Sequence, residues 1–237
     1  MIFDTHSHLY FDQLVPREEE IIANMKTLGV THSVQIGCDI ASSISAINLA
    51  KKYPNFYATV GFHPVDAQDP STRKTRSSAS GNELPETREG IIATMRDLIE
   101  TNRKHVVAIG ETGLDYHYLE SDKTDTQKSE QYFWFETQAR LAKEYNLPLV
   151  IHSRDASADT IKYLKLYGVT HCVIHCFSEN WEFAKELLEY SDDIYFSFSG
   201  ILTYKNAPDI QEAARNIPLD RILIETDAPF LTPVPKR

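Results

Sequence analysis

The chain has 237 residues, of which 42% are hydrophobic and 24% are charged, and its net charge is −10 at pH 7. The acidic excess argues against capture of nucleic acid by a basic surface, although bound divalent metals would supply local positive charge. No apolar run reaches the roughly 18 residues of a membrane-spanning helix, and the N-terminus has no secretory signal. Three cysteines are too few for a disulfide framework. We therefore expect a reduced, cytoplasmic protein, or a nuclear one if its source is eukaryotic.

Short apolar, β-branched segments alternate with amphipathic segments along the whole chain. The segments typical of strands lie at 1–6, 32–37, 56–62, 106–111, 147–152, 172–177, 194–199 and 222–226. Segments with helical periodicity lie at 17–28, 41–53, 87–103, 128–146, 156–168, 180–191 and 206–217. Parallel strands need crossover helices, and eight βα units can close into a barrel. The pattern predicts one domain over 1–237, a slightly distorted (β/α)8 TIM barrel in the α/β class whose eighth outer helix is missing.

An open, doubly wound sheet is the alternative, but the first predicted βα turn lacks a GxGxxG pattern. One segment, 65–90, is rich in Ser, Thr, Pro, Gly and charged residues, and we expect it to be a flexible inserted loop. It follows the third predicted strand, so it would emerge on the catalytic face of a barrel. Arg73, Lys74 and Arg76 could there reach a polyanionic substrate.

Side chains that ligate metals occur at the predicted carboxyl ends of the strands, where the active sites of (β/α)8 barrels lie. These residues are His6, His8, His63, Glu111, His152, His175 and Asp227. Because side chains alternate along a strand, His6 and His8 point to the same side and can converge on one cation. Imidazole with carboxylate suits zinc, manganese or iron better than calcium. The number of ligands is sufficient for two metals that share a carboxylate.

Two cysteines, Cys172 and Cys176, flank His175 and raise the question of a zinc site. On a strand both would face away from His175, toward the helices. We interpret them as buried thiols beneath the helices rather than as ligands.

The motifs DTHSHL, GFHP, IGETGLDY, IHSRDA, HCFS and ETDAPFL follow one another from residue 4 to residue 231. Together they resemble the TatD-type metal-dependent deoxyribonucleases of the amidohydrolase superfamily. The resemblance implies that one metal ion is held by His6, His8 and Asp227. A second would be held by His152 and His175, and Glu111 would bridge the two.

The same resemblance implies the substrate contacts and the reaction. His63 and Arg154 would lie near the substrate phosphate, and Tyr116 would lie near the pocket. The family hydrolyses phosphodiester bonds and trims DNA from the 3′ end with magnesium, manganese or zinc. We expect a monomer that acts on DNA, with RNA as the alternative, and that has no membrane partner.

The expected mechanism gives catalytic roles to Asp227 and Glu111. Asp227 is the candidate general base, because a carboxylate that contacts both metal and water can accept the proton of that water. Arg154 could make a bidentate contact with a phosphoryl oxygen, although an ion pair with Asp155 or another acidic residue is an alternative.

Three features depart from the family pattern. Glu179 replaces the glycine of the usual HCFSG motif, and this carboxylate could bind metal or repel phosphate. The segment 65–90 is not typical, and the family continues for about one more helix. The sequence leaves open whether the chain is truncated there.

Two other functions remain open from the sequence. The same site could hydrolyse an ester or an amide, for example a D-aminoacyl-tRNA. The strand at 106–111 has no lysine, which argues against the subtype whose metals share a carbamylated lysine. A barrel that binds nucleic acid without turnover is the third possibility.

Overall fold

The computed structural model describes residues 1–68 and 87–236. Eight strands form one sheet in the order β1 to β8, and every neighbouring pair is parallel. The strands are β1 (Ile2–Ser7), β2 (Val30–Gln35), β3 (Phe56–Val60), β4 (Val106–Asp115), β5 (Leu149–Arg154), β6 (Cys172–Ile174), β7 (Ile194–Phe198) and β8 (Ile222–Ile224). This confirms the predicted barrel and excludes the open doubly wound sheet, in which the spatial order of strands departs from the sequence order.

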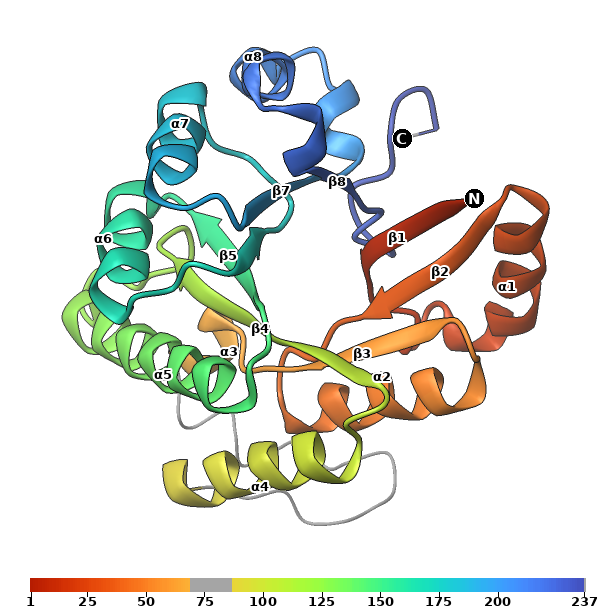
Figure 1. Cartoon of the computed structure of the whole chain (residues 1–237), viewed down its shortest axis with the longest axis horizontal. Helices are drawn as coiled ribbons and strands as arrows, with labels where there is room; N and C mark the ends of the chain where they lie inside the picture. Colours follow the sequence, from red (N-terminus) through yellow and green to blue (C-terminus); the bar gives the residue numbers. More distant parts are fainter. Residues whose placement is uncertain (69–86, 237) are drawn as a thin grey trace.

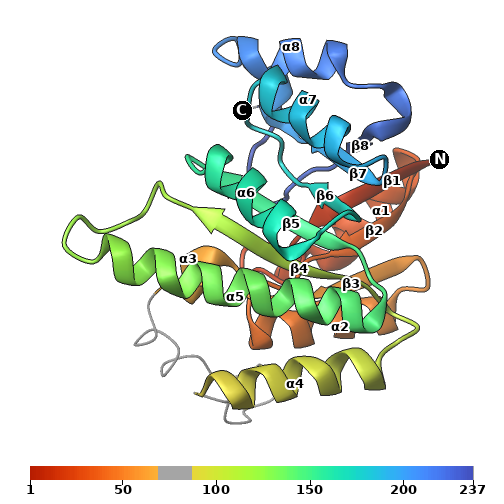
Figure 2. The same cartoon turned by 60° about the vertical axis from the view of Figure 1, so that its left-hand side comes forward.

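Helices cover the outside of the strands (Figures 1 and 2). They are α1 (Glu18–Thr27), α2 (Ile40–Lys52), α3 (Pro64–Ala67), α4 (Arg88–Thr101), α5 (Thr124–Tyr145), α6 (Ser157–Tyr167), α7 (Trp181–Tyr190) and α8 (Pro208–Asn216). From β8 to Lys236, the last residue described, no helix follows, as predicted. No helix in the described ranges is both long enough and apolar enough to cross a membrane.

Local sequence accounts for several helix ends. Asp39 accepts a hydrogen bond from the backbone of Ser42, whose side chain in turn accepts one from Asp39, and this capping box starts α2. Asn146 and Gly168 adopt positive φ angles of 51° and 66° at the ends of α5 and α6. Both residue types tolerate this left-handed conformation, so the two predicted helix ends are confirmed.

The predicted elements differ from the structure mainly at their boundaries. β6 ends at Ile174, three residues earlier than expected, whereas β4 continues to Asp115, four residues further than expected. α3 was not predicted, because one helical turn has too little periodicity to be recognised. The expected loop at 65–90 is helical at both ends, because α3 covers its first residues and α4 begins at Arg88. The rest of that loop, with Arg73, Lys74 and Arg76, lies outside the described residues.

The core lies between the strands and the helices. Phe196 and Phe198 on β7 contact Phe177, which also contacts Phe183 on α7. These four rings are at most 5% exposed. Burial of each phenylalanine contributes about 1.5–3 kcal/mol, so this layer holds the helix ring against the strands.

The seam between β8 and β1 is closed by the residues that follow β8. The Thr226 backbone N–H and hydroxyl both donate to the Asp4 carboxylate, at 2.9 and 2.7 Å. The Asp227 N–H donates to the His6 carbonyl at 2.9 Å, and the His8 N–H donates to the Ala228 carbonyl at 2.8 Å. The two ends of the barrel therefore meet at the predicted metal ligands.

Close approach of β3 and β4 depends on a glycine. A Cβ atom at residue 61 would lie 2.0 Å from the carbonyl carbon of Gly110. Only glycine avoids this clash, so Gly61 allows the end of β3 to lie beside the backbone that carries Glu111.

Candidate metal centre

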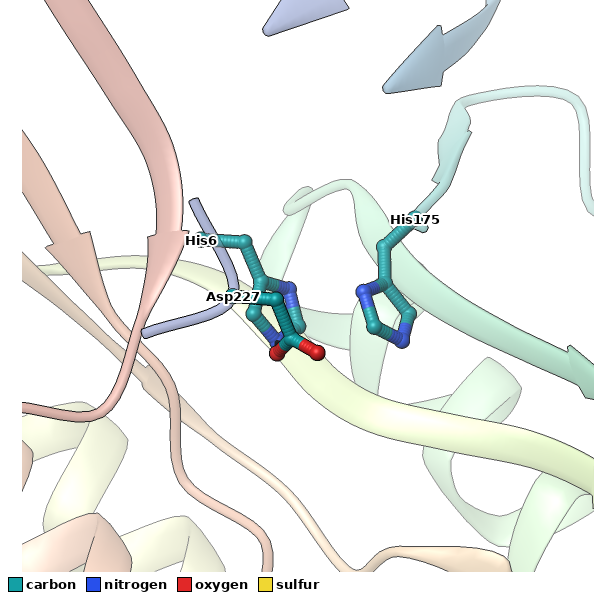
Figure 3. Close-up of side chains that lie close together, drawn as sticks. All are labelled: His6, His175 and Asp227. Atoms are coloured by element: carbon teal, nitrogen blue, oxygen red, sulfur yellow. Dashed lines mark ion pairs between the residues drawn. The ribbon is translucent and has the colours of Figure 1, made fainter. Parts of the chain in front are cut away.

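The predicted ligands converge at the carboxyl ends of the strands. His6 lies on β1, His175 directly after β6, and Asp227 after β8 (Figure 3). The rings of His6 and His175 stack with centroids 3.9 Å apart and planes 12° apart. His6 Nε2 lies 3.5 Å from Asp227 Oδ1, and His8 Nε2 lies 3.3 Å from the same oxygen. Residues separated by more than 200 positions in the sequence thus form one cluster.

Glu111 lies at the middle of the cluster, and its two oxygens face different histidines. Oε2 lies 3.5 Å from His6 Nε2. Oε1 lies 2.7 Å from His175 Nε2, 3.0 Å from His152 Nδ1 and 3.3 Å from His63 Nε2. The carboxylate therefore separates one group of donors on its Oε2 side from a second group on its Oε1 side.

Three overlapping sets of side chains are spaced closely enough to hold a cation. Within the described part of the chain these sets are His6, His175 and Asp227; His6, His8 and Glu111; and His63, Glu111 and His152. All six predicted ligands occur in them. His63, predicted to contact substrate, is also present.

A tyrosine fixes the tautomer of His8. The Tyr10 hydroxyl donates to the Ile36 carbonyl at 2.6 Å, so its oxygen accepts the proton of His8 Nδ1 at 2.9 Å. Burial raises the pKa of Tyr10, which keeps the hydroxyl protonated. His8 Nε2 is therefore left with a free lone pair directed at the cluster, as a metal ligand requires.

Carboxylates outside the cluster orient two more histidines. Asp115 Oδ2 lies 2.9 Å from His152 Nε2, and Glu225 Oε1 lies 3.4 Å from His175 Nδ1. Both carboxylates are buried, and Glu225 Oε1 also accepts the backbone N–H of Cys176 at 2.8 Å. Such partners fix ring orientation and increase ligand basicity in metalloenzymes. Tyr10, Asp115 and Glu225 were not predicted from the sequence, although Asp115 belongs to the motif IGETGLDY and Glu225 to the motif ETDAPFL.

Electrostatics keep the carboxylates of the cluster ionised. Burial alone would raise the pKa of Glu111, but the charges and hydrogen bonds of His175, His63 and His152 lower it well below its usual range. Burial likewise opposes ionisation of Asp227, yet the neighbouring His8, His6 and His175 lower its pKa. Burial and the charge of His175 lower the pKa of His6, which favours the neutral form that binds metal.

His63 differs from the other histidines in its tautomer. Its Nδ1 accepts the backbone N–H of Val65 at 3.2 Å, because His63 is the N-cap of α3. The proton of the neutral ring is therefore on Nε2, the atom that faces Glu111. A nitrogen that carries a proton is a hydrogen-bond donor rather than a metal ligand.

The other two predicted substrate contacts have different positions. Arg154 lines the pocket above the cluster, and its guanidinium lies 5.2 Å from the Tyr118 ring. Of the two interpretations of Arg154, the ion pair with Asp155 is not formed in the described residues, where Asp155 pairs with His117. The structure does not bring Tyr116 to the pocket.

The hydroxyl of Tyr116 instead contacts Tyr132 and Asp159, at 2.7 and 2.6 Å. Tyr118, two residues further along, lines the pocket in its place. The family motif marks this tyrosine-rich turn, but it does not indicate which ring points inward.

The carboxylate of Glu179 points away from the cluster. It accepts hydrogen bonds from the Ser153 hydroxyl at 3.2 Å and from the Ser157 hydroxyl at 2.5 Å. Ser157 is the first residue of α6, so the negative charge lies at a helix N-terminus, where it is stabilised. Glu179 therefore neither reaches the donors nor lines the pocket.

The two cysteines near His175 are not equivalent. Cys172 is buried, as predicted. The prediction for Cys176 is wrong, because β6 has already ended and a φ angle of 44° turns this residue toward the pocket. A third cysteine, Cys38, also lines the pocket, with its sulfur 3.7 Å from Glu111 Oε2.

The cluster lies at the floor of a pocket of about 660 Å³. Both imidazole and carboxylate groups and apolar side chains line it. The apolar lining residues are Phe11, Val65, Tyr118, Ile201, Phe230 and Leu231. This volume falls within the usual range for small-molecule sites.

A (β/α)8 barrel with this His, Glu and Asp cluster at its strand ends is a metal-dependent hydrolase, and sequence comparisons agree. The profile of the family described as TatD related DNase matches residues 3–237, so the chain belongs to this family. YabD of Bacillus subtilis, an uncharacterized metal-dependent hydrolase, is 40% identical over 239 residues, which cover the whole chain and 84% of YabD.

Two further comparisons support this placement. YcfH of Escherichia coli, also described as an uncharacterized metal-dependent hydrolase, is 33% identical over the whole chain and 80% of its own length. The crystal structure of YJJV, a TatD homologue of Escherichia coli, superposes with a TM-score of 0.80. YJJV is 26% identical, and the match covers 97% of this chain and 80% of YJJV.

Proposed function

We propose that the chain is a nuclease that hydrolyses phosphodiester bonds, releasing nucleotides from the 3′ end of DNA. The observation that carries this proposal is the position of Glu111, whose two oxygens face two separate groups of donors. Such an arrangement suits two divalent cations that share one carboxylate, the kind of site used for phosphodiester cleavage. The description of the family as TatD related DNase supports the choice of substrate.

The residues of the cluster fit divalent cations. His6 Nε2 and His8 Nε2 lie 3.2 Å apart, close enough for both to contact one cation. His6, His8 and Asp227 would hold one ion, His152 and His175 the other, and Glu111 would bridge them. Magnesium, manganese or zinc bound there would lower the pKa of water and offset the charge of the phosphate.

The remaining steps belong to side chains of this chain. The neighbouring histidines outweigh burial and lower the pKa of Asp227, so its carboxylate would be available to accept the proton of the attacking water. His63 Nε2–H, which lies 3.3 Å from Glu111 Oε1, would donate to a phosphoryl oxygen of the bound substrate. Arg154 lines the same pocket and would contact a second oxygen through its guanidinium.

The proposal is tested by an exonuclease assay on single-stranded DNA together with metal analysis of the purified protein. Asp227→Asn should lower kcat by about 10²–10⁴-fold, the range for loss of a general base. Glu111→Gln should lower kcat as well, because it removes a charged ligand that both metal ions would share. Asp220→Asn and Glu212→Gln, which change acidic residues away from the pocket, are the matched controls. Cleavage at the wild-type rate by either site variant would contradict the assignment.

The same assay separates the alternative bonds. A D-aminoacyl ester and a simple amide should be hydrolysed more slowly than DNA at the same manganese concentration. Faster hydrolysis of the ester or of the amide would show that the site is an esterase or an amidase rather than a nuclease.

A further inference from the structure

An exposed aromatic ring lies beside the metal centre without a role in it. Phe230 follows Asp227 by three residues, and its backbone N–H donates to the Asp227 carbonyl at 2.8 Å. Its side chain is 48% exposed and lines the pocket. The centroid of its ring lies 6.5 Å from that of His8, so an apolar surface directly adjoins the ligands.

A second ring holds Phe230 in place. Phe11 packs against Phe230 at 5.6 Å with the planes 80° apart, and it contacts His8 at 5.4 Å in a similar edge-to-face arrangement. Tyr10 stacks on Phe11 at 5.3 Å. The orientation of Phe230 is therefore set by Phe11, a positioning residue, while much of the Phe230 ring remains open to the pocket.

The described lining residues of the pocket include more acidic than basic ones, so the apolar ring of Phe230 matters for binding a polyanionic substrate. Among the lining residues in the described ranges, Arg154 is the single lysine or arginine, whereas Asp66, Glu111, Asp115 and Asp227 are acidic. Tight binding of nucleic acid usually depends on many basic contacts with phosphates. Within the described part of the pocket, uncharged contacts would therefore add to the affinity supplied by the metals and Arg154, and aromatic stacking is the strongest such contact.

We propose that Phe230 is a stacking platform for the nucleobase next to the scissile phosphate, a deeper claim that rests on the proposed nuclease function. A phosphate at the cluster and a base attached through its sugar can contact His8 and Phe230 together, given the short distance between the two rings. A base can stack on Phe230 only after it leaves its own helical stack. The site therefore selects unpaired ends, with little preference among the four bases.

The test compares two oligodeoxynucleotides that differ in one group. One has a natural base beside the cleaved bond and the other has an abasic sugar there. For the wild-type protein, kcat/KM should be roughly 5- to 150-fold higher for the natural oligonucleotide, which corresponds to the measured range for one stacked base. Phe230→Ala should lower kcat/KM for the natural substrate and leave the abasic one unchanged, whereas Phe230→Trp should retain the preference.

Phe3→Ala is the matched control. Phe3 is 39% exposed and also stacked on other rings, but it lies at the start of β1, at the opposite end of the barrel. This variant should keep the wild-type preference for the natural base. Equal cleavage of both oligonucleotides by the wild-type protein would overturn the stacking role and leave the nuclease function intact.

A binding measurement tests stacking without turnover. A dinucleotide that contains 2-aminopurine and an uncleavable methylphosphonate link should lose fluorescence when magnesium-loaded wild-type protein is added, because stacking quenches this base. Phe230→Ala should abolish the quenching. Failure to cleave any DNA together with quenching would reject the nuclease function alone, whereas absence of quenching would reject the stacking platform.

Discussion

At the centre of the site, the hydroxyl of Tyr10 determines which nitrogen of His8 is available to a cation. This hydroxyl accepts the proton of His8 Nδ1 and donates its own proton to the Ile36 carbonyl. The Nε2 atom of neutral His8 is therefore unprotonated, and its lone pair faces the cluster. Partners of this kind affect metal affinity almost as strongly as the ligands themselves.

We therefore predict that Tyr10→Phe raises the dissociation constant for manganese by about 10–100-fold, the usual effect of losing such a partner. Titration calorimetry of the metal-free protein measures it. Tyr57→Phe, which removes a hydroxyl from β3 away from the cluster, should bind manganese like the wild type. Unchanged affinity in Tyr10→Phe would show that the His8 tautomer is set in another way.

Glu179 gives the second prediction for a single residue. Its carboxylate is bound by the hydroxyls of Ser153 and Ser157, so Glu179→Gly should leave kcat/KM at the wild-type value. The loss of two charge-assisted hydrogen bonds should instead lower the free energy of unfolding by about 1–3 kcal/mol. Urea denaturation and the nuclease assay measure the two effects.

Glu179→Gln is the matched control for this change. It keeps an acceptor for one hydroxyl but removes the charge at the N-terminus of α6, so its loss of stability should be smaller. A many-fold gain in activity for Glu179→Gly, without loss of stability, would show that the carboxylate disturbs catalysis.

At the scale of elements, the sequence predicted where each ligand lies better than where its side chain points. Hydrophobic runs predicted the strands, and the rule for barrel active sites placed the six predicted metal ligands at the carboxyl end of the barrel. Strict alternation along a strand then failed for Cys176, because β6 ends at Ile174 and the next residues follow their own φ angles.

Partners outside the cluster could not be predicted for a different reason. Asp115 makes one hydrogen bond with His152, and Glu225 lies close to His175 without a hydrogen bond to it. Asp115 also follows a register shift between Ile109 and Thr112 in the pairing of β4 with β5. No periodicity in the sequence reports a shift of this kind. Periodicity also does not indicate whether Tyr116 or Tyr118 faces the pocket, because both residues follow the end of β4.

A salt bridge between two helices gives a pH-dependent prediction. Glu18 at the start of α1 accepts hydrogen bonds from Lys52 at 2.6 Å and Tyr53 at 2.5 Å, at the end of α2. Burial opposes ionisation of Glu18, but these two hydrogen bonds outweigh it and lower its pKa from 4.5. Because the folded-state pKa is depressed, the contribution to stability is complete above pH 4.5 and is lost as pH falls through the lowered value.

Glu18→Gln should therefore lower the free energy of unfolding at pH 7 by about 0.2–1 kcal/mol, the range for pairs near the surface. Denaturation curves at several pH values should show this difference vanishing in acid. Glu19→Gln, on the same turn of α1, should show no such pH dependence. A difference that persists in acid would assign the effect to packing.

At the scale of the whole molecule, metal binding should stabilise the fold. The donors come from β1, β4, β5 and the residues after β6 and β8, so a bound cation connects distant parts of the barrel. Manganese at about 100 times its dissociation constant should add about 2.7 kcal/mol to the free energy of unfolding. For a chain of this size Tm should rise by roughly 5–10 °C.

Thermal scans with and without manganese, and after treatment with a chelator, measure this shift. Calcium should have a smaller effect, because histidine nitrogens are poor ligands for it. Glu111→Gln should lose most of the shift. An equal Tm with and without manganese would show that the cluster does not hold the metal in the folded protein.

The seam between β8 and β1 also determines when the site can exist during synthesis. His6 and His8 leave the ribosome well before Asp227 and the backbone of Ala228, which complete their surroundings. Early strands can pair while the rest of the chain is still being made. A nascent chain thus carries an incomplete set of ligands until β8 and the residues after it have been made, and the complete cluster forms only when β8 is in place beside β1.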